Sequence, residues 1–215
     1  MHRGFALKFA IAVFVKTPGV SPIKTRLAAD IGSDEALKVY LKCLAAVEKK
    51  IIAVVENSPY LIEPFWAVAE KNSLSNSCWK SWPQIYQGEG ELGNRLDKVY
   101  SELLMSHDGV ILMGADSPLF PAQEVANGID WLAQNKLGAA IGPTLDGGYY
   151  FFGCRRPIPK TVWTSVPYSR ENTLETFSKV LPSDFGKYFL AKHWDIDTLD
   201  DLHRLKLEDP SFLDE

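Results

Sequence analysis

The chain has 215 residues, of which 46% are hydrophobic and 23% charged, and its formal net charge is -4. This length fits one domain or at most two small ones, and the composition argues against intrinsic disorder. The acidic balance and the lack of a long basic run argue against nucleic acid or an anionic membrane as a partner.

Two features bear on the cellular location. The cysteines, Cys43, Cys78 and Cys154, are odd in number and widely separated, which favours a reduced, cytoplasmic setting. The opening MHRGFALKFAIAVFV resembles a signal peptide, but Lys8 interrupts its apolar run and KTPG follows in place of a cleavage site. The remaining run is far too short to span a membrane, so we expect a first strand there.

Apolar runs of strand length alternate with helical periodicity along most of the chain. Helical spacing recurs over residues 37–47, 92–103 and 125–132. Such alternation predicts an α/β sandwich with a mainly parallel sheet. The predicted strands are AIAVFV (10–15), IIAVVEN (51–57), PQIYQ (83–87), GVILMGAD (109–116), GAAIGPT (138–144), GYYFFG (148–153) and a stretch ending in KHWDI (192–196). The two runs that flank the Gly-rich turn at 145–148 predict an antiparallel excursion late in the sheet.

Three cations, Lys16, Lys24 and Arg26, surround the loop KTPGVSPIKTRLA between the first strand and the first helix. Backbone N–H groups at such a junction can face an anion, and lysine or arginine can neutralise it. The loop is therefore either a cradle for phosphates or a solvated surface loop. It is neither a Walker loop nor a dinucleotide fingerprint, because GVSPIK lacks the required glycines.

Carboxylates follow two of the predicted strands. Asp116 ends GVILMGAD, where it is placed either to hold Mg²⁺ or Mn²⁺ against a diphosphate or to cap the Ser-Pro turn after it. Asp195 and Asp197 stand two apart at the end of the last predicted strand. Residues 198–201 form a T-x-x-D helix start, which Asp197 could simply support, whereas Asp195 is a candidate second metal ligand.

Two Gly-rich segments carry further candidates. In TLDGGYYFFG, Asp-Gly between two apolar runs is the commonest short hairpin signal. The functional interpretation is that Gly147 and Gly148 let the backbone approach a ligand closely, with Asp146 beside it. Arg95, which opens a helix after QGEGELG, either reaches a phosphate or carboxylate or is an ordinary surface arginine.

Taken together, five stretches in this order resemble a known family: VFVKTPGVSPIKTRLA, QGEGELGNRL, GADSP, GPTLDGGYYFFG and DIDTLDDL. They are similar to the small bacterial glycosyltransferase-like proteins of the nucleotide-diphospho-sugar transferase superfamily, which are often labelled as arsenosugar-biosynthesis-type glycosyltransferases. The resemblance implies a glycosyltransferase-A fold, a Rossmann-like three-layer α/β/α sandwich with a mixed sheet. It implies one domain over residues 1–215, with a nucleotide-binding half at about 8–116 and an acceptor and metal half at about 117–215.

The resemblance also implies roles for residues. The KTRL element from Lys24 onwards is similar to the phosphate-contacting loop of related nucleotidyltransferases. Asp116 matches the position of the divalent metal, Asp195 or Asp197 matches a second acidic site, and residues 146–148 match the DGGY element.

The chain departs from the family's pattern in two places. Ser21 and Pro22 stand where a glycine and a basic residue are usual. Around Ser169, a candidate substrate residue, Tyr168 and Arg170 replace parts of a Trp-Ser-Thr element. The second departure concerns the acceptor side.

The main hypothesis is transfer of a sugar from a nucleotide-diphospho-sugar to a small-molecule acceptor. Asp116, with Asp195, would hold Mg²⁺ or Mn²⁺ at the diphosphate, while Lys24 and Arg26 stabilise the leaving group. Asp146 would contact the sugar or act as a base on the acceptor. The alternatives are a nucleotidyltransferase that joins an NTP-derived nucleotide to a phosphorylated small molecule and releases pyrophosphate, and a catalytically silent nucleotide-binding module. A homo-oligomer is left open.

Overall fold

The computed structural model describes residues 6–213, so the first five residues of the signal-like opening lie outside the described part. Within it, one sheet has the strand order β3-β2-β1-β4-β6-β5-β7. Only β6 runs antiparallel to its neighbours β4 and β5, so the mainly parallel sheet and its late antiparallel excursion are confirmed. The strands are β1 (Lys8–Val15), β2 (Leu61–Val68), β3 (Gln84–Tyr86), β4 (Gly109–Gly114), β5 (Gly138–Pro143), β6 (Tyr149–Cys154) and β7 (Gly186–Phe189).

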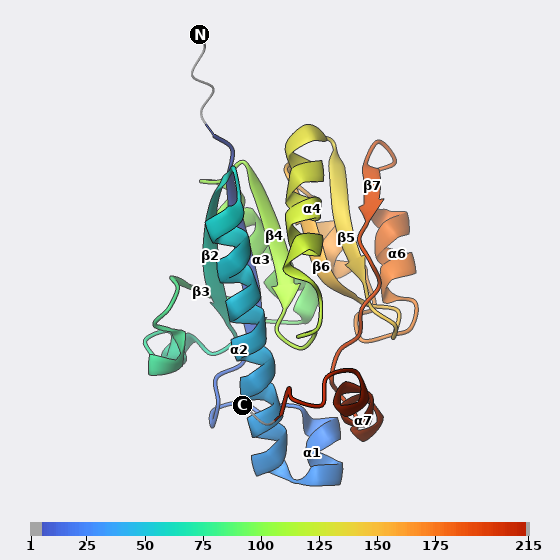
Figure 1. The fold of residues 1–215 in the computed structure, drawn as a ribbon. Helices are drawn as coiled ribbons and strands as arrows, with labels where there is room; N and C mark the ends of the chain where they lie inside the picture. Colours follow the sequence, from blue (N-terminus) through green and yellow to red (C-terminus); the bar gives the residue numbers. More distant parts are fainter. Residues whose placement is uncertain (1–5, 214–215) are drawn as a thin grey trace.

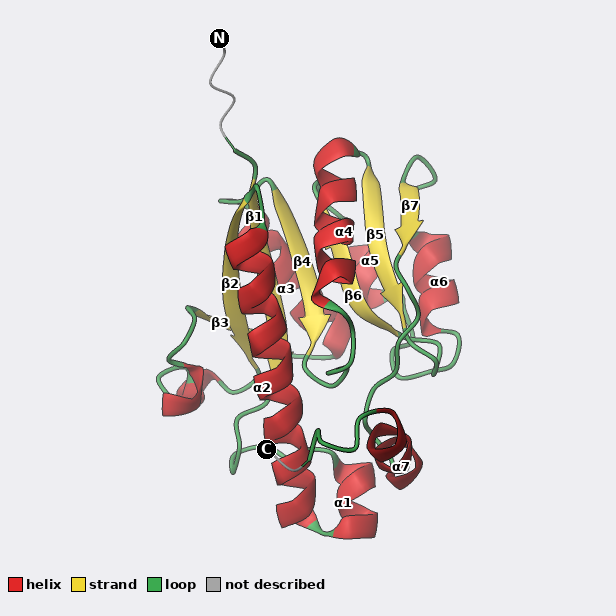
Figure 2. Cartoon of the chain, viewed as in Figure 1, coloured by secondary structure: helices red, strands yellow, loops and turns green. Residues whose placement is uncertain are grey.

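Helices cover both faces of this sheet, which gives the three layers that Figures 1 and 2 show. In Figure 1, α2 and α4 lie in front of the sheet, and α3 and α6 lie behind it. The helices are α1 (Thr25–Ile31), α2 (Ser33–Asn57), α3 (Leu92–Leu104), α4 (Ala122–Gln134), α5 (Lys160–Thr164), α6 (Thr173–Val180) and α7 (Leu199–Glu208), with 3₁₀ turns at Lys71–Ser73 and Ser77–Trp79. The helical spacings at 37–47, 92–103 and 125–132 lie in α2, α3 and α4, as predicted.

The alternation of side chains along β1 explains why both faces are apolar. Ile11 and Val13 belong to the core cluster under α2 and α4, whereas Ala10 and Ala12 belong to the cluster under α3, α5 and α6. Successive residues of a strand point to opposite faces, so a central strand must be apolar throughout.

A third, smaller cluster packs α1 and α7 against the first turns of α2, beyond the carboxyl ends of the strands (Figure 1). Its fully buried members include Leu27 of α1, Leu205 of α7 and Ile196, which precedes α7. This third cluster matters for the site because Lys24 and Arg26 shortly precede Leu27, and Asp195 and Asp197 flank Ile196.

The prediction of a strand at 51–57 is wrong, because these residues form the end of α2. Val47, Ile51 and Val54 continue the helical spacing that begins earlier in α2. All three are buried in the cluster between α2 and the sheet. The strand that pairs with β1 is instead β2. Its Pro64, which has no amide hydrogen to donate, lies in the part of β2 that β3 does not pair.

The prediction of a strand ending in KHWDI (192–196) is also wrong. His193 makes one isolated bridge to Thr144, and the last strand is β7, which pairs with β5. The apolar residues Trp194 and Ile196 pack into the third cluster and not into the sheet. Among residues 6–213, no helix is both long and apolar enough to cross a membrane.

Candidate functional site

A cavity of about 770 Å³ opens at the edge of the sheet where the parallel strands end. Ligands bind at this edge in open α/β sheets. The loops after β4 and β5 line the cavity, together with the turn before α6 and the segment before α7. Seven predicted site residues are among its lining: Arg26, Asp116, Asp146, Gly148, Ser169, Asp195 and Asp197.

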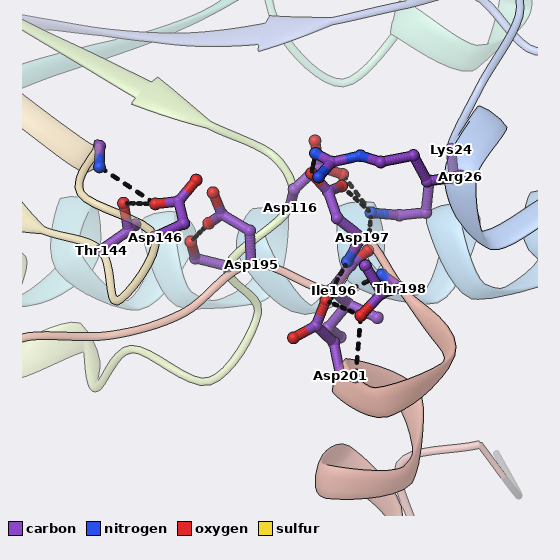
Figure 3. A network of polar contacts seen from close by, with 12 residues as sticks. Lys24, Arg26, Asp116, Thr144, Asp146, Asp195, Ile196, Asp197, Thr198 and Asp201 are labelled. Atoms are coloured by element: carbon purple, nitrogen blue, oxygen red, sulfur yellow. Dashed lines mark hydrogen bonds and ion pairs between the residues drawn. The ribbon is translucent and has the colours of Figure 1, made fainter. Parts of the chain in front are cut away.

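Beside this cavity, two cations of the first loop meet two carboxylates from distant parts of the chain (Figure 3). The Lys24 ammonium donates to Asp116 Oδ1 at 2.6 Å and lies 3.7 Å from Asp197 Oδ1. Arg26 Nη2 donates to Asp197 Oδ2 at 2.6 Å. Cations and carboxylates that the sequence singles out separately are therefore paired with one another in the structure.

Burial and charge act in opposite directions on these groups. Burial is the largest single influence on the pKa of Lys24 and would lower it, but the charge and hydrogen bond of Asp116, together with Cys43 and Asp197, outweigh burial and the pKa is raised. Burial and the nearby charge of Asp116 raise the pKa of Asp197, against the pull of Lys24 and Arg26. Burial raises the pKa of Asp195 to about 7.

Asp195 and Asp146 lie farther along the cavity, each held by a hydroxyl group. Figure 3 shows Asp195 between the Lys24–Asp116 pair and Asp146. Ser117 Oγ donates to Asp195. Thr144 Oγ1 donates to Asp146 Oδ1 at 2.5 Å, and the amide of Gly148 donates to the same oxygen at 3.1 Å. Asp146 thus caps the β5–β6 hairpin turn, as the structural interpretation predicts, and also faces the cavity.

The hairpin turn and the segment before α6 are pressed together. Gly147 has a φ of +86°, and a Cβ placed there would lie 1.8 Å from the carbonyl oxygen of Glu171, so only glycine fits. The amide of Leu174 donates to the carbonyl of Gly147 at 2.9 Å. Ser169 also has a positive φ, 59°, which is uncommon for a residue with a side chain. The contacts of Gly147 with Glu171 and Leu174 therefore fix the position of the segment before α6, which carries Ser169 at the cavity wall.

Two predicted residues point elsewhere. Lys16 Nζ donates to the carbonyl of Pro22 at 3.2 Å, and Arg95 Nε donates to the carbonyl of Gly90 at 2.9 Å. Lys16, Lys24, Arg95 and Gly147 lie outside the lining of the cavity. Their contacts with a nucleotide stay a prediction.

Glu70 is a residue of this edge that the sequence interpretation missed. It follows β2, and its Oε2 accepts a hydrogen bond from the amide of Thr17 at 2.9 Å. Tyr40 OH donates to the carbonyl of Lys16 at 2.9 Å, so side chains from α2 and from the segment after β2 hold the start of the cationic loop. A correct assignment of β2 would have placed Glu70 at the carboxyl edge.

The donor set fits a divalent ion that is shared with a substrate. Among the described residues, no group of three or more His, Cys, Asp or Glu side chains is arranged to hold a metal. Asp116 and Asp197 nevertheless converge on one cation, Lys24. Mg²⁺ usually takes one or two carboxylates and completes its shell with water and substrate phosphates. Two aspartates of this kind therefore fit the metal that the fold family implies.

Solved structures share this fold. A protein from Desulfovibrio desulfuricans, described as a "putative nucleotide-diphospho-sugar transferase", has a TM-score of 0.74 and 24% identity over 94% of this chain and 87% of its own. CMP:2-keto-3-deoxy-manno-octonic acid synthetase, complexed with CTP, has a TM-score of 0.59 and 12% identity over 95% and 99%. Rv0371c from Mycobacterium tuberculosis, in complex with manganese, has a TM-score of 0.52 and 15% identity over 94% and 99%. The glycosyltransferase-A-like fold is confirmed.

No curated protein matches the chain. These comparisons do not confirm the arsenosugar-biosynthesis type. One family model, described as "Uncharacterized protein conserved in bacteria (DUF2064)", matches residues 62–170, about half of the chain. The match includes Asp116, Asp146 and Ser169 of the cavity wall. The chain therefore belongs to the DUF2064 family.

Proposed function

We propose that the protein is a metal-dependent transferase that moves a glycosyl group from a nucleotide-diphospho-sugar to a small-molecule acceptor. The observation that carries the proposal is the meeting of Lys24 and Arg26 with Asp116 and Asp197 beside a cavity of about 770 Å³. The volume suits a small-molecule site, and the position is the ligand-binding edge of an open α/β sheet. The fold shared with nucleotide-diphospho-sugar transferases supports the same class.

The two halves of the chain would divide the work. Residues 8–116 would bind the nucleotide, with Lys24 and Arg26 donating hydrogen bonds to phosphate oxygens. Residues 117–215 would supply the acceptor side, where Asp146 and Ser169 line the cavity. Lys16 and Arg95 remain candidates for contacts at the margin of the nucleotide, and Gly147 and Gly148 for a close backbone approach to the sugar.

Asp116 and Asp197 would hold Mg²⁺ or Mn²⁺, which when bound supplies positive charge against the diphosphate, with Asp195 a candidate further ligand. In the transfer, the bond between the anomeric carbon and the phosphate oxygen breaks, and an acceptor oxygen forms the new bond. Arg26 stabilises the negative charge that develops on the leaving diphosphate. Asp146, which Thr144 orients, accepts the proton that the acceptor hydroxyl loses.

Thermal unfolding tests this proposal directly. A panel of NTPs and nucleotide-sugars is tested with and without Mn²⁺, because a ligand that binds only the folded state raises the Tm. We expect one nucleotide-sugar to raise the Tm in a metal-dependent manner. Asp116→Ala should abolish the shift and lower kcat/KM for that donor by about 10²-fold or more, as is typical when charge stabilisation in a transition state is lost.

A matched control is Asp34→Ala, which removes an exposed aspartate of α2 that does not line the cavity. This variant should keep both the shift and the turnover. If Asp116→Ala retains the metal-dependent shift, the assignment of the metal to this edge is wrong. If neither an NTP nor a nucleotide-sugar shifts the Tm of the unaltered protein, the proposal of a nucleotide-dependent transferase is refuted.

A nucleotidyltransferase is the second candidate, because the same fold occurs in CMP:2-keto-3-deoxy-manno-octonic acid synthetase complexed with CTP. Such an enzyme would join the nucleotide to a small-molecule acceptor and release pyrophosphate. The two candidates differ in the leaving group. Detection of pyrophosphate with an NTP would favour nucleotidyl transfer, and detection of a nucleoside diphosphate with a nucleotide-sugar would favour glycosyl transfer.

A further inference from the structure

The Lys24 ammonium sits where a cation is bound by protein oxygens. Its side chain is 2% exposed. It donates to Asp116 Oδ1 at 2.6 Å and to the carbonyl of Ile196 at 2.5 Å, and Asp197 Oδ1 lies 3.7 Å away. Two carboxylates and a backbone carbonyl thus surround one positive charge. The exposed side chain of Arg26 donates to Asp197 Oδ2, the other oxygen of that carboxylate, at 2.6 Å.

The backbone of Lys24 is in an unfavourable conformation. Its φ of 45° and ψ of 50° lie in the left-handed region, although it is the N-cap of α1 and has a side chain. Residues with side chains adopt this region only where their surroundings enforce it. Lys24 thus combines a left-handed backbone at the start of α1 with a buried ammonium that three oxygens surround.

A divalent ion cannot share Asp116 Oδ1 with the ammonium. Mg²⁺ binds carboxylate oxygens at about 2.0–2.1 Å and requires a nearly regular shell of oxygen ligands around it. The ammonium of Lys24, 2.6 Å from the same oxygen, occupies that space and carries a like charge. A metal that binds both Asp116 Oδ1 and Asp197 Oδ1, the two oxygens that face the ammonium, therefore has to displace Lys24.

We propose that Lys24 is an internal cation that holds the place of the divalent metal and moves to the phosphates of the nucleotide when the metal binds. This inference rests on the proposed function. A displaced ammonium that finds no partner is costly, but a diphosphate supplies oxygens for it. The metal frees the Lys24 ammonium, which can then bind the diphosphate, and the diphosphate stabilises the displaced ammonium. Metal and diphosphate therefore bind with positive cooperativity. The free protein has low affinity for the metal alone.

Titration calorimetry with Mn²⁺ alone tests the competition, and the readout is affinity and not activity. Lys24→Met removes the charge and keeps an apolar stem of similar length, so Mn²⁺ should bind at least about tenfold more tightly than to the unaltered protein, because two carboxylates lose their internal cation. Lys24→Gln, whose amide can still donate to the carbonyl of Ile196, is the second variant if Lys24→Met does not fold. Lys136→Met is the control, because Lys136 is an exposed lysine that does not line the cavity; its Mn²⁺ affinity should not change.

Cooperativity is tested with Mg²⁺ and inorganic pyrophosphate as probes, singly and together, by the shift in Tm. In the unaltered protein the joint shift should exceed the sum of the single shifts, and in Lys24→Met it should not. Equal or weaker Mn²⁺ binding by both Lys24 variants overturns the inference and leaves the proposed function standing if the unaltered protein still binds metal with a nucleotide. If Mn²⁺ fails to bind under every condition, both are overturned.

Discussion

At the scale of the residue, three aspartates of one site differ because their surroundings differ. Asp116 is paired with Lys24, and Asp197 is paired with Arg26 and lies near Lys24. Among residues 6–213, no cation forms an ion pair with Asp195; it accepts a hydrogen bond from Ser117, and burial raises its pKa to about 7. Asp116 and Asp197 are thus placed to hold a cation, whereas Asp195 is suited to exchange a proton near neutral pH.

Glu70 gives a residue-scale prediction because it anchors the cationic loop through the amide of Thr17. Partial burial alone would raise its pKa, but hydrogen bonds from Ser21 and Thr17 outweigh burial, and the pKa is lower than its ordinary value of 4.5. Stability from ionised Glu70 is therefore present above that value and is lost as the pH falls through the lower pKa of the folded state. We expect Glu70→Gln to lower the free energy of unfolding by about 1 kcal/mol at pH 7, the usual net value of one hydrogen bond.

Urea unfolding of both proteins between pH 7 and pH 3 checks this prediction. The deficit of Glu70→Gln should shrink on the acid side, because protonation then removes the same charge from the unaltered protein. Glu56→Gln, at an exposed position of α2, is the control and should show no deficit. A deficit that is constant across the pH range would show that Glu70 acts through packing and not through its charge.

At the scale of the element, the start of α7 holds the carboxylate that precedes it. Thr198 Oγ1 accepts from the amide of Asp201, and Asp201 Oδ2 accepts from the amides of Thr198 and Asp197. This capping box satisfies donors that the helix leaves free and fixes the backbone of Asp197 at the same time. The sequence prediction of a T-x-x-D helix start is confirmed, and its role extends to the candidate site.

Removal of this cap should have a cost of its own. We expect Thr198→Ala to lower the free energy of unfolding by about 1 kcal/mol, the typical effect of losing an N-cap hydroxyl, and Thr198→Ser to restore most of it. Chemical denaturation of the two variants measures the difference. If alanine and serine destabilise equally, the methyl group of Thr198 and not its hydroxyl is what matters.

The same scale shows where the sequence suffices and where it does not. Strands β1, β4, β5 and β6 were predictable because each is a short apolar run between turn signals. β2 was not, because Glu63 and Pro64 interrupt it, while the more apolar run 51–57 is helical. That error also hid Glu70. Whether such a segment forms a strand depends on which neighbouring strand it can pair with in the folded sheet. The local sequence pattern does not show this pairing.

The candidate site was predictable in residue type but not in pairing. Strand-end carboxylates and a cationic loop could be found because the carboxyl ends of parallel strands share one edge. The contact of Lys24 with Asp116 and the carbonyl of Ile196 joins residues far apart in the chain, so no local spacing indicates it. Likewise, nothing in VPYSRENTL indicates the left-handed conformation of Ser169.

At the scale of the whole molecule, the site lies between the sheet and the third cluster, which share helix α2. The sheet and its covering helices form the two large clusters, which carry Asp116 at the end of β4. The third cluster joins α1 and α7 and carries Lys24 and Asp197 at its boundary. The ion pair between Lys24 and Asp116 therefore connects the third cluster to the sheet, and a ligand that displaces Lys24 would break this connection.

Loss of a buried side chain in the third cluster should consequently increase local unfolding of α1 and α7 together, while the sheet stays folded. Leu27→Ala, which empties a fully buried position, should cost about 2–5 kcal/mol of local stability. Ile129→Ala, in the buried face of α4, is a control of the same size within the first cluster. Hydrogen exchange should show that Leu27→Ala speeds exchange of amides in α1 and α7 and leaves β1 and β4 protected, because regions of few long-range contacts open separately. Equal loss of protection in all elements would show instead that the third cluster and the sheet unfold as one unit, and Lys24 could then not be released without opening the core.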